Sequence, residues 1–284
     1  MPSPQSPVVV AFHGELGAFS EEAASSLWPN ATPVPVRSVA EVVRAVSSGQ
    51  ADAGVLPVEN TVAGGVVAAY DALATADELH AVAEAILRIN QCLVAVPGAT
   101  LADIRVVESH PIALAQCAAF LGTLGEREGG IEERTASDTA SAAKAVAEGV
   151  DRRRAAIARK DAARRYGLSI LAEHIEDRSD NQTRFLGVAR APVTLAFGTL
   201  ARTSLMFTTA NQPGALLRVL EPLARCGLNL SKLESRPTGE PWTYRFFADI
   251  DHDAGDDRLT QALELIGAAT QTCRILGTYA KART

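Results

Sequence analysis

Short apolar runs alternate with amphipathic, alanine-rich stretches along the first 190 residues of the chain. Residues 8–12, 53–56 and 92–96 are continuously apolar, which is typical of strands buried in a parallel sheet. Stretches with helical periodicity follow these runs, and one of them opens on a capping box from Ser38 to Glu41. Strands that alternate with helices in this way predict a mostly parallel α/β fold.

The alternation occurs as two series, one before about residue 80 and one after it. We therefore expect two α/β lobes with a cleft between them, as in periplasmic binding proteins. The first lobe would contain residues 8–80 and, where the chain returns to it, residues 175–190. The second lobe would contain residues 81–174.

The pattern changes after Ala191 and Pro192. Six further elements follow in the order strand, helix, strand, strand, helix, strand, at residues 203–208, 211–226, 228–237, 244–250, 259–269 and 273–277. This order predicts a ferredoxin-like βαββαβ module. We therefore expect a first domain at residues 1–192, containing both lobes, and a second domain at residues 202–284.

The composition is that of a globular protein, with 47% hydrophobic and 21% charged residues among 284. A formal net charge of −6 argues against a nucleic-acid surface. No apolar run approaches the roughly 20 residues of a membrane span. Residues 1–7 have neither a basic region nor a long apolar core, so we expect a short disordered lead rather than a signal peptide, and a cytoplasmic location.

Metal-binding signatures are missing from the sequence. Cys92, Cys117, Cys226 and Cys273 are far apart and form no CxxC pair, so we expect buried free thiols. The five histidines form no pair with ligand spacing, which makes a zinc site improbable.

A glycine-containing turn follows the first predicted strand. Gly14 and Gly17 free this turn, and we expect Ser20 to cap the helix after it. The third glycine of a GxGxxG fingerprint is absent, so we assign no nucleotide to this loop.

Polar side chains also lie at the ends of several predicted strands, where open α/β sheets collect ligand groups. Asn181, Thr183 and Arg184 stand at the mouth of one strand, and residues 59–61 follow another. Ser109 precedes a helix that begins with a proline and contains Gln116. Each group taken alone is more often a turn, a cap or a solvated loop than a binding site.

Together these loops resemble one family, prephenate dehydratase with a C-terminal ACT regulatory domain. The matching segments span nearly the whole chain in the family's order: GELGAFSE from residue 14, PVENT from 57, SHPIALAQC from 109, NQTRF from 181, NQPGALL from 211 and LNLSKLESRP from 228. No chorismate mutase segment precedes residue 8, so the resemblance is to the monofunctional form.

The resemblance implies decarboxylative dehydration of prephenate to phenylpyruvate, CO2 and water, without a metal or cofactor. Thr183 matches the catalytic threonine and would bond the leaving hydroxyl. Arg184 would anchor a carboxylate or hold the loop, and Glu59 would act as an acid, if burial raises its pKa, or hold the loop. The remaining site positions implied by the resemblance are Asn60, Thr61, Ser109, Gln116 and Asn181, with Phe19 and Phe185 as apolar walls.

The resemblance also implies feedback regulation by L-phenylalanine, bound between the regulatory modules of two subunits. One effector segment would be Gly214, Ala215, Leu216 and Leu217, and the other would be Glu234, Ser235 and Arg236. Such a shared site requires a homodimer or homotetramer.

Three positions depart from the family's common pattern: Ala18 replaces a hydroxyl residue, Thr61 replaces serine, and Ile112 replaces glutamine. Because two polar groups are lost, arogenate stays open as an alternative substrate. A cytosolic ligand sensor without enzymatic activity also stays open, because two lobes with a cleft do not by themselves assign a function.

Overall fold

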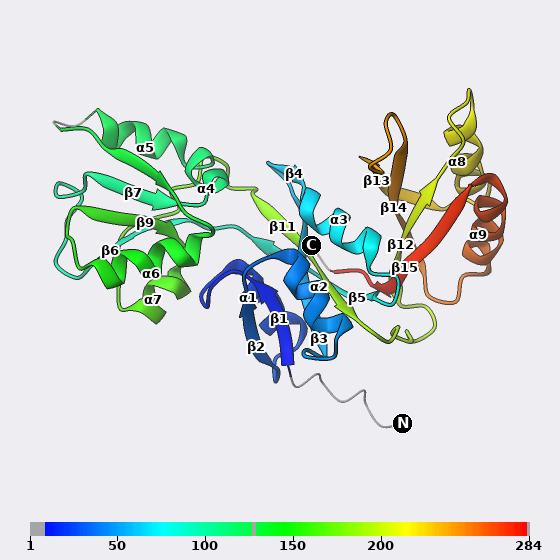
Figure 1. Cartoon of the computed structure of the whole chain (residues 1–284), viewed down its shortest axis with the longest axis horizontal. Coiled ribbons are helices and arrows are strands. Elements are labelled where there is room, and N and C mark those ends of the chain that lie inside the picture. The colour runs from blue at the N-terminus through cyan, green and yellow to red at the C-terminus, as the bar shows by residue number, and fades with distance from the viewer. Residues whose placement is uncertain (1–8, 127–128, 283–284) are drawn as a thin grey trace.

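A computed structural model describes residues 9–126 and 129–282. The second lobe, the first lobe and the C-terminal module follow one another along the longest axis of the molecule (Figure 1). The expected N-terminal lead at residues 1–7 lies outside the described residues.

The first lobe is built on a mixed sheet with the strand order β2-β1-β3-β11-β5, and β4 pairs with β3. Its strands are β1 (Val9–His13), β2 (Thr32–Val36), β3 (Ala53–Asn60), β4 (Gly64–Gly65), β5 (His80–Arg88) and β11 (Gln182–Ala189). Its helices are α1 (Phe19–Leu27), α2 (Val39–Ser47) and α3 (Val67–Thr75). Helix α1 packs on one face, while α2 and α3 cover the other. Ser38 caps α2 as predicted, because its hydroxyl accepts a hydrogen bond from the Glu41 amide at 3.2 Å.

The second lobe contains another mixed sheet, with the strand order β10-β6-β9-β7-β8. Its strands are β6 (Cys92–Ala95), β7 (Val106–Ser109), β8 (Glu132–Thr135), β9 (Arg154–Ala158) and β10 (Ser169–Glu173). Its helices are α4 (Pro111–Ala115), α5 (Ala118–Gly125), α6 (Thr139–Gly149) and α7 (Lys160–Tyr166). Asp138 caps α6 by accepting hydrogen bonds from the Ala140 and Ser141 amides, both at 2.9 Å.

The expected limit between the lobes at residue 80 is wrong. Strand β5 pairs with β11 in the sheet of the first lobe, with Glu84 opposite Leu186. The chain therefore passes into the second lobe between Arg88 and Cys92, after β5 rather than before it. The apolar alternation of residues 80–86 fits a strand in either sheet, so the sequence pattern alone does not place this strand.

The C-terminal module contains one antiparallel sheet, with the strand order β13-β14-β12-β15. Its elements are β12 (Leu200–Thr208), α8 (Ala215–Arg225), β13 (Asn229–Pro237), β14 (Tyr244–Asp253), α9 (Asp257–Ala269) and β15 (Thr272–Ala280). Both helices pack on one face of this sheet, away from the first lobe (Figure 1). The two α/β lobes and the βαββαβ module confirm the predicted fold class.

The free face of the module's sheet packs against the first lobe. Tyr70 of α3 meets Phe247 of β14 with ring centroids 4.8 Å apart. A Cβ atom at Gly277 would lie 2.0 Å from the carbonyl oxygen of Ala81, so only glycine fits where β15 crosses β5. The module therefore makes close contact with α3 and β5 of the first lobe.

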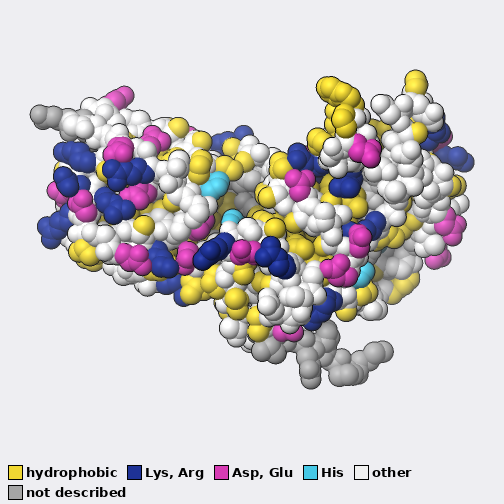
Figure 2. All heavy atoms as spheres, in the orientation of Figure 1, with side chains coloured by type: hydrophobic (Ala, Val, Ile, Leu, Met, Phe, Trp, Pro, Cys, Tyr) yellow, Lys and Arg dark blue, Asp and Glu magenta, His cyan; other side chains and the backbone are white. Residues whose placement is uncertain are grey.

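Lysine and arginine side chains are mixed with aspartate and glutamate over the second lobe on the face shown in Figure 2, rather than gathered into a patch of one sign. Among the helices in the described parts of the chain, none combines the length and the apolar character required to cross a membrane.

Candidate active site

Asn60, the last residue of β3, lies at the centre of a network of side-chain amides. Its amide nitrogen donates to the hydroxyl of Thr183 at 2.9 Å and to the side-chain oxygen of Asn181 at 2.7 Å. Its own oxygen accepts a hydrogen bond from the Gln116 amide at 3.3 Å. The network thus joins residues that are 56 to 123 positions apart in the sequence.

Gln116 links this network to the second lobe, because it directly follows α4. Its side-chain oxygen accepts a hydrogen bond from the Asn181 amide at 2.9 Å. Thr61 holds the segment at residues 180–182 in place. Its hydroxyl accepts a hydrogen bond from the Gln182 amide at 2.9 Å and donates one to the Asp180 carbonyl at 3.2 Å. The structure therefore brings together five of the residues expected in the site: Asn60, Thr61, Gln116, Asn181 and Thr183.

A cavity of about 360 Å³ opens beside this network, between the lobes. It is lined by Val62, Ala63, Ile112, Ala115, Gln116, Asp177, Arg178 and Asn181. The volume and the largely apolar lining with a few polar groups suit a small organic ligand. Thr183 does not line the cavity itself but lies directly behind Asn60, with 9% of its surface exposed.

Arg178 is the cation of this cavity, and the sequence reasoning did not single it out. Its guanidinium pairs with the Asp180 carboxylate, with nitrogen–oxygen distances of 3.0 and 2.7 Å. Both side chains are more than half exposed, so this pair contributes little stability and can exchange for a ligand carboxylate. The feature of the sequence that could have indicated Arg178 is its position in the loop that leads directly into Asn181.

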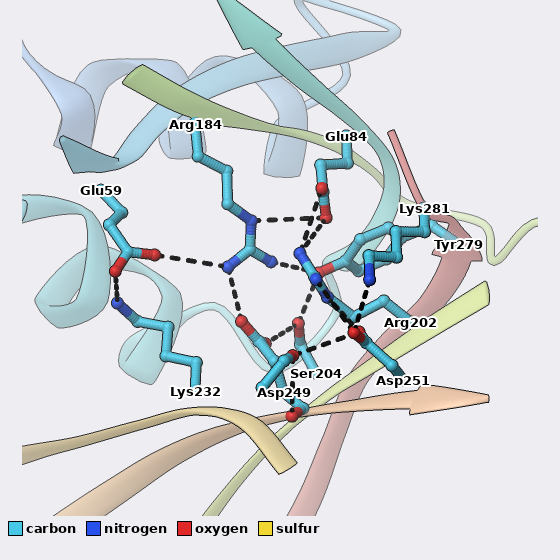
Figure 3. A network of polar contacts seen from close by, with 11 residues as sticks. Glu59, Glu84, Arg184, Arg202, Ser204, Lys232, Asp249, Asp251, Tyr279 and Lys281 are labelled. Carbon is cyan, nitrogen blue, oxygen red and sulfur yellow. Dashed lines mark hydrogen bonds and ion pairs between the residues drawn. The ribbon is translucent and has the colours of Figure 1, made fainter. Parts of the chain in front are cut away.

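Arg184 does not line the cavity, so the geometry does not support the first of its two expected roles, that of a carboxylate anchor. Its guanidinium points into the contact with the module, where Nη1 lies 2.5 Å from Asp249 and Nη2 donates to the Tyr279 hydroxyl at 2.8 Å (Figure 3). Successive side chains of a strand point to opposite faces, and Thr183 already occupies the face toward Asn60.

Glu59 does not line the cavity either, for the same reason, so the geometry does not support its expected role as an acid. It pairs with Arg184 in the register of β3 and β11, while Asn60 pairs with Thr183. Its carboxylate lies 2.8 Å from the Lys232 ammonium and 3.7 Å from the Arg184 guanidinium (Figure 3). The pair Asn60 and Thr183 therefore lies on the side of the cavity, and the adjacent pair Glu59 and Arg184 lies on the side of the module.

Ser109 lies away from the amide network. It is fully buried at the end of β7, and its hydroxyl donates to the Ile157 carbonyl of β9 at 2.7 Å. This hydrogen bond satisfies the hydroxyl within the sheet of the second lobe, so the structure assigns it to that sheet rather than to the cavity.

The two phenylalanines expected as walls do not line the cavity either. Phe185 is buried in the core beneath α1, with residues such as Phe12 and Val55. Phe19 is the first residue of α1, and the Arg159 guanidinium lies 5.4 Å from the centroid of its ring. It borders a separate hollow, which Arg88 and Cys92 also line. Both residues were expected in the site because they are aromatic residues within matching motifs. Aromatic residues are also used to pack the core, as Phe185 is here.

His110 precedes α4 near the lobe contact. Its Nδ1 atom accepts a hydrogen bond from the Ile112 amide at 3.2 Å, which requires an unprotonated nitrogen. Burial lowers the pKa of His110; nearby Asp138 acts in the opposite direction, and His13 lowers it further. The imidazole is therefore neutral at pH 7 and serves as a helix cap rather than as an acid.

The two expected effector segments lie on different sides of the module's sheet within one chain. Gly214 precedes α8 in the left-handed conformation, with φ of 78°, on the side of the helices. Arg236 of β13 faces the first lobe, where its guanidinium lies 3.8 Å from Asp71 of α3. Glu234 lies on the same face, against Gly65 of β4.

Within residues 9–126 and 129–282, no three His, Cys, Asp or Glu side chains come together as metal ligands would. The polar groups of the cavity are amides, one guanidinium and one carboxylate, which suit hydrogen bonding to an organic anion.

Two known protein families match the chain. The family model of prephenate dehydratase matches residues 10–193, and that of the ACT domain matches residues 203–266. The chain belongs to the prephenate dehydratase family. The expected family is thus confirmed, and the module on the far side of the first lobe is an ACT domain.

Several members of this family resemble the chain over most of its length. The chain is 38% identical to arogenate dehydratase/prephenate dehydratase 1 of Arabidopsis thaliana, over 96% of this chain and 72% of the relative. It is 35% identical to a bifunctional N-acyl-homoserine lactone acylase/prephenate dehydratase of Komagataeibacter europaeus, over 95% of each chain. The crystal structure of prephenate dehydratase in complex with L-Phe from Arthrobacter aurescens superposes with a TM-score of 0.87 and 35% identity, covering 96% of this chain and 90% of that one.

These relatives are named as dehydratases, so the chain is an enzyme of the lyase type. The alternative of a sensor without enzymatic activity is therefore not retained.

Proposed function

We propose that this enzyme converts prephenate to phenylpyruvate, CO2 and water in L-phenylalanine biosynthesis, and that L-phenylalanine regulates it through the ACT domain. The observation that carries the proposal is the hydrogen bond from Asn60 to Thr183, at the edge of a cavity that the two lobes share. The names of the relatives support a substrate of this class, since they include both prephenate and arogenate dehydratases, and those of the two bacterial relatives name prephenate dehydratase and not arogenate dehydratase.

The hydrogen bond from Asn60 prepares Thr183 for its role. An amide nitrogen is only a donor, so the Thr183 oxygen accepts and its own proton stays available. The Thr183 hydroxyl can therefore donate a hydrogen bond to the ring hydroxyl of prephenate as the C–O bond breaks. The hydroxyl of threonine is too weak an acid to lose the proton outright, so the proton that completes water reaches the leaving oxygen through solvent or a neighbouring group.

Aromatisation supplies the driving force, because loss of CO2 and of the hydroxyl turns the cyclohexadiene ring into a benzene ring. The enzyme's task is then to hold the dianion so that both groups depart in one geometry. Arg178 provides the positive charge for one carboxylate, and Gln116 and Asn181 provide amide groups beside it. The apolar Ile112 and Val62 border the space for the ring.

Arogenate is the second candidate substrate. It carries an ammonium group where prephenate has a keto group, and an ammonium group requires an acceptor. Asp177 lines the cavity and can supply one, although its Oδ1 atom also accepts a hydrogen bond from the Ala119 amide at 3.1 Å. Incubation of the enzyme with each substrate, with detection of phenylpyruvate and of phenylalanine, distinguishes the two.

Regulation by L-phenylalanine is proposed because the Arthrobacter relative was solved in complex with L-Phe. Gly214 and Glu234 lie on opposite sides of the ACT sheet in one chain, so an effector site that uses both segments requires a second copy. We therefore include a homodimer or homotetramer in the proposal. The cytoplasmic location expected from the sequence stays a prediction.

A further inference from the structure

The strand pair β3 and β11 carries two adjacent residue pairs that face different parts of the molecule. Thr183 lies opposite Asn60, and Arg184 lies opposite Glu59. The first pair forms the active-site hydrogen bond, and the second pair contacts the ACT domain. One backbone step therefore separates the catalytic hydroxyl from a charged contact with the regulatory domain.

Arg184 is held by partners from several strands. Its guanidinium contacts Asp249 of β14 at 2.5 Å and the hydroxyl of Tyr279 of β15 at 2.8 Å, and its Nε atom lies 3.3 Å from Glu84 of β5 (Figure 3). Only about 10% of its side chain is exposed. A guanidinium has a rigid fork of donors, so these contacts fix its position relative to the ACT sheet.

The charges at this contact are balanced. Four cations and four carboxylates form one connected cluster: Arg184, Arg202, Lys232 and Lys281 with Glu59, Glu84, Asp249 and Asp251 (Figure 3). A buried charge that loses its partner is strongly destabilising, so a shift of the ACT sheet that leaves a partner behind is disfavoured. The sheet and the strands β3 and β11 therefore tend to move together.

Lys232 connects this cluster to an expected effector segment. It lies on β13, on the same face as Glu234 and Arg236 two and four residues later. Its ammonium lies 2.8 Å from the Glu59 carboxylate. A ligand that changes the position of β13 moves Lys232 and thereby acts on Glu59, which pairs with Arg184 and precedes Asn60.

We propose that Arg184 and Glu59 are positioning residues, which couple the state of the ACT domain to the hydrogen bond between Asn60 and Thr183. They touch no substrate; they set the placement of the two strands whose next residues form the active site. This inference rests on the proposed function for its kinetic consequences. It assigns the charged cluster to communication between the domains, rather than to carboxylate binding.

The test uses mild substitutions in the full chain, because replacing Arg184 itself would leave Asp249 and Glu84 buried beside a missing cation. Lys232→Met, Glu59→Gln and the double variant each weaken one link of the cluster. Asp77→Asn is the matched control, because it removes a carboxylate that pairs with Arg274 of the ACT domain at 2.9 Å without contact to β3 or β11.

Two quantities are measured for each protein: the Kd of L-phenylalanine by calorimetry, and the factor by which saturating L-phenylalanine changes kcat/KM. We expect both single variants to keep the Kd within about twofold, while that factor falls at least about fivefold toward one, as for a lost coupling. The double variant should lose no more than the larger single effect, because both substitutions break the same link. Asp77→Asn should behave as wild type.

The inference is overturned if Lys232→Met and Glu59→Gln respond to L-phenylalanine as strongly as wild type, or if active wild type shows no response at all. Failure of the proposed function is a separate result, in which wild type converts neither prephenate nor arogenate. Hydrogen exchange then tests the inference without turnover. We expect faster amide exchange across Gln182–Ala189 in Lys232→Met than in Asp77→Asn, and equal exchange in both would overturn it.

Discussion

Thr183 and Arg184 are neighbours in β11 but belong to different sites. The Thr183 hydroxyl accepts a hydrogen bond from Asn60 at 2.9 Å, and the Arg184 guanidinium contacts Asp249 of the ACT domain at 2.5 Å. The alternation of side chains along a strand makes this division unavoidable once either residue is placed. A sequence motif that resembles one catalytic unit therefore divides between the candidate active site and the domain contact.

The Thr183 hydroxyl should be required for turnover. Thr183→Ala removes a hydrogen bond that strengthens in the transition state, and we expect kcat to fall by about 10²- to 10³-fold. Thr183→Ser retains the hydroxyl and should keep most of the rate. Steady-state kinetics on both variants, with thermal melting to confirm folding, checks this. Near wild-type kcat in Thr183→Ala would remove the residue from the mechanism.

Arg178 should act mainly in substrate binding. Arg178→Gln removes the cation that lines the cavity, and losing a charge-assisted hydrogen bond of about 1.5–3 kcal/mol should raise KM roughly 10- to 150-fold with a smaller change in kcat. Arg153→Gln is the matched control, because Arg153 forms a similar exposed pair with an aspartate two residues away, Asp151. Equal KM values in the two variants would show that the substrate carboxylate binds elsewhere.

The charged cluster should lose stability in acid through Asp251, which pairs with Arg202 and Lys281 within the ACT domain. Burial alone would raise the pKa of Asp251, but hydrogen bonds from Arg202 at 2.7 Å and Lys281 at 2.6 Å outweigh it and lower the pKa. A carboxylate with a lowered pKa contributes stability above its unfolded pKa of about 3.9, and loses that contribution as the pH falls through its folded pKa.

Thermal melting between about pH 6 and pH 2 checks this with Asp251→Asn. The Tm of the variant should be lower than that of wild type near neutral pH, and the difference should shrink as the pH falls. A difference that stays constant over this range would show that the ionisation of Asp251 does not stabilise the fold.

L-Phenylalanine should bind at the start of α8. Gly214 has φ of 78°, and a Cβ atom there would lie 3.2 Å from the Arg218 guanidinium. Gly214→Val therefore strains the turn and fills the space before the helix N-terminus, where backbone amides can bind a carboxylate. Calorimetric titration should show binding to wild type and at least tenfold weaker binding to the variant, or about 1.4 kcal/mol. Equal affinity would place the effector elsewhere.

The sequence pattern predicts the buried strands well but misses two of the strands at the edges of the sheets. Strand β2 contains two prolines, and β8 consists of exposed, mostly charged residues. Both are edge strands that pair on one side only, where prolines and charges are tolerated and an apolar run is not needed. Their existence depends on tertiary pairing, which local composition does not encode.

The candidate site shows the same division. The amide and hydroxyl residues Asn60, Gln116, Asn181 and Thr183 could be predicted, because polar ends of strands in an α/β fold converge at one cleft. The side on which Arg184 and Glu59 lie could have been inferred from strand alternation relative to Thr183. The contact that receives them could not, since it depends on where the ACT sheet packs against the first lobe.

The most direct test of the central claim is turnover by the purified wild-type enzyme with prephenate and arogenate side by side. Phenylpyruvate is followed by its absorbance in alkali, and phenylalanine by chromatography. We predict that prephenate is converted to phenylpyruvate at a higher kcat/KM than arogenate to phenylalanine, and that Thr183→Ala lowers the rate for both. Faster conversion of arogenate would make it the substrate, and conversion of neither would contradict the account.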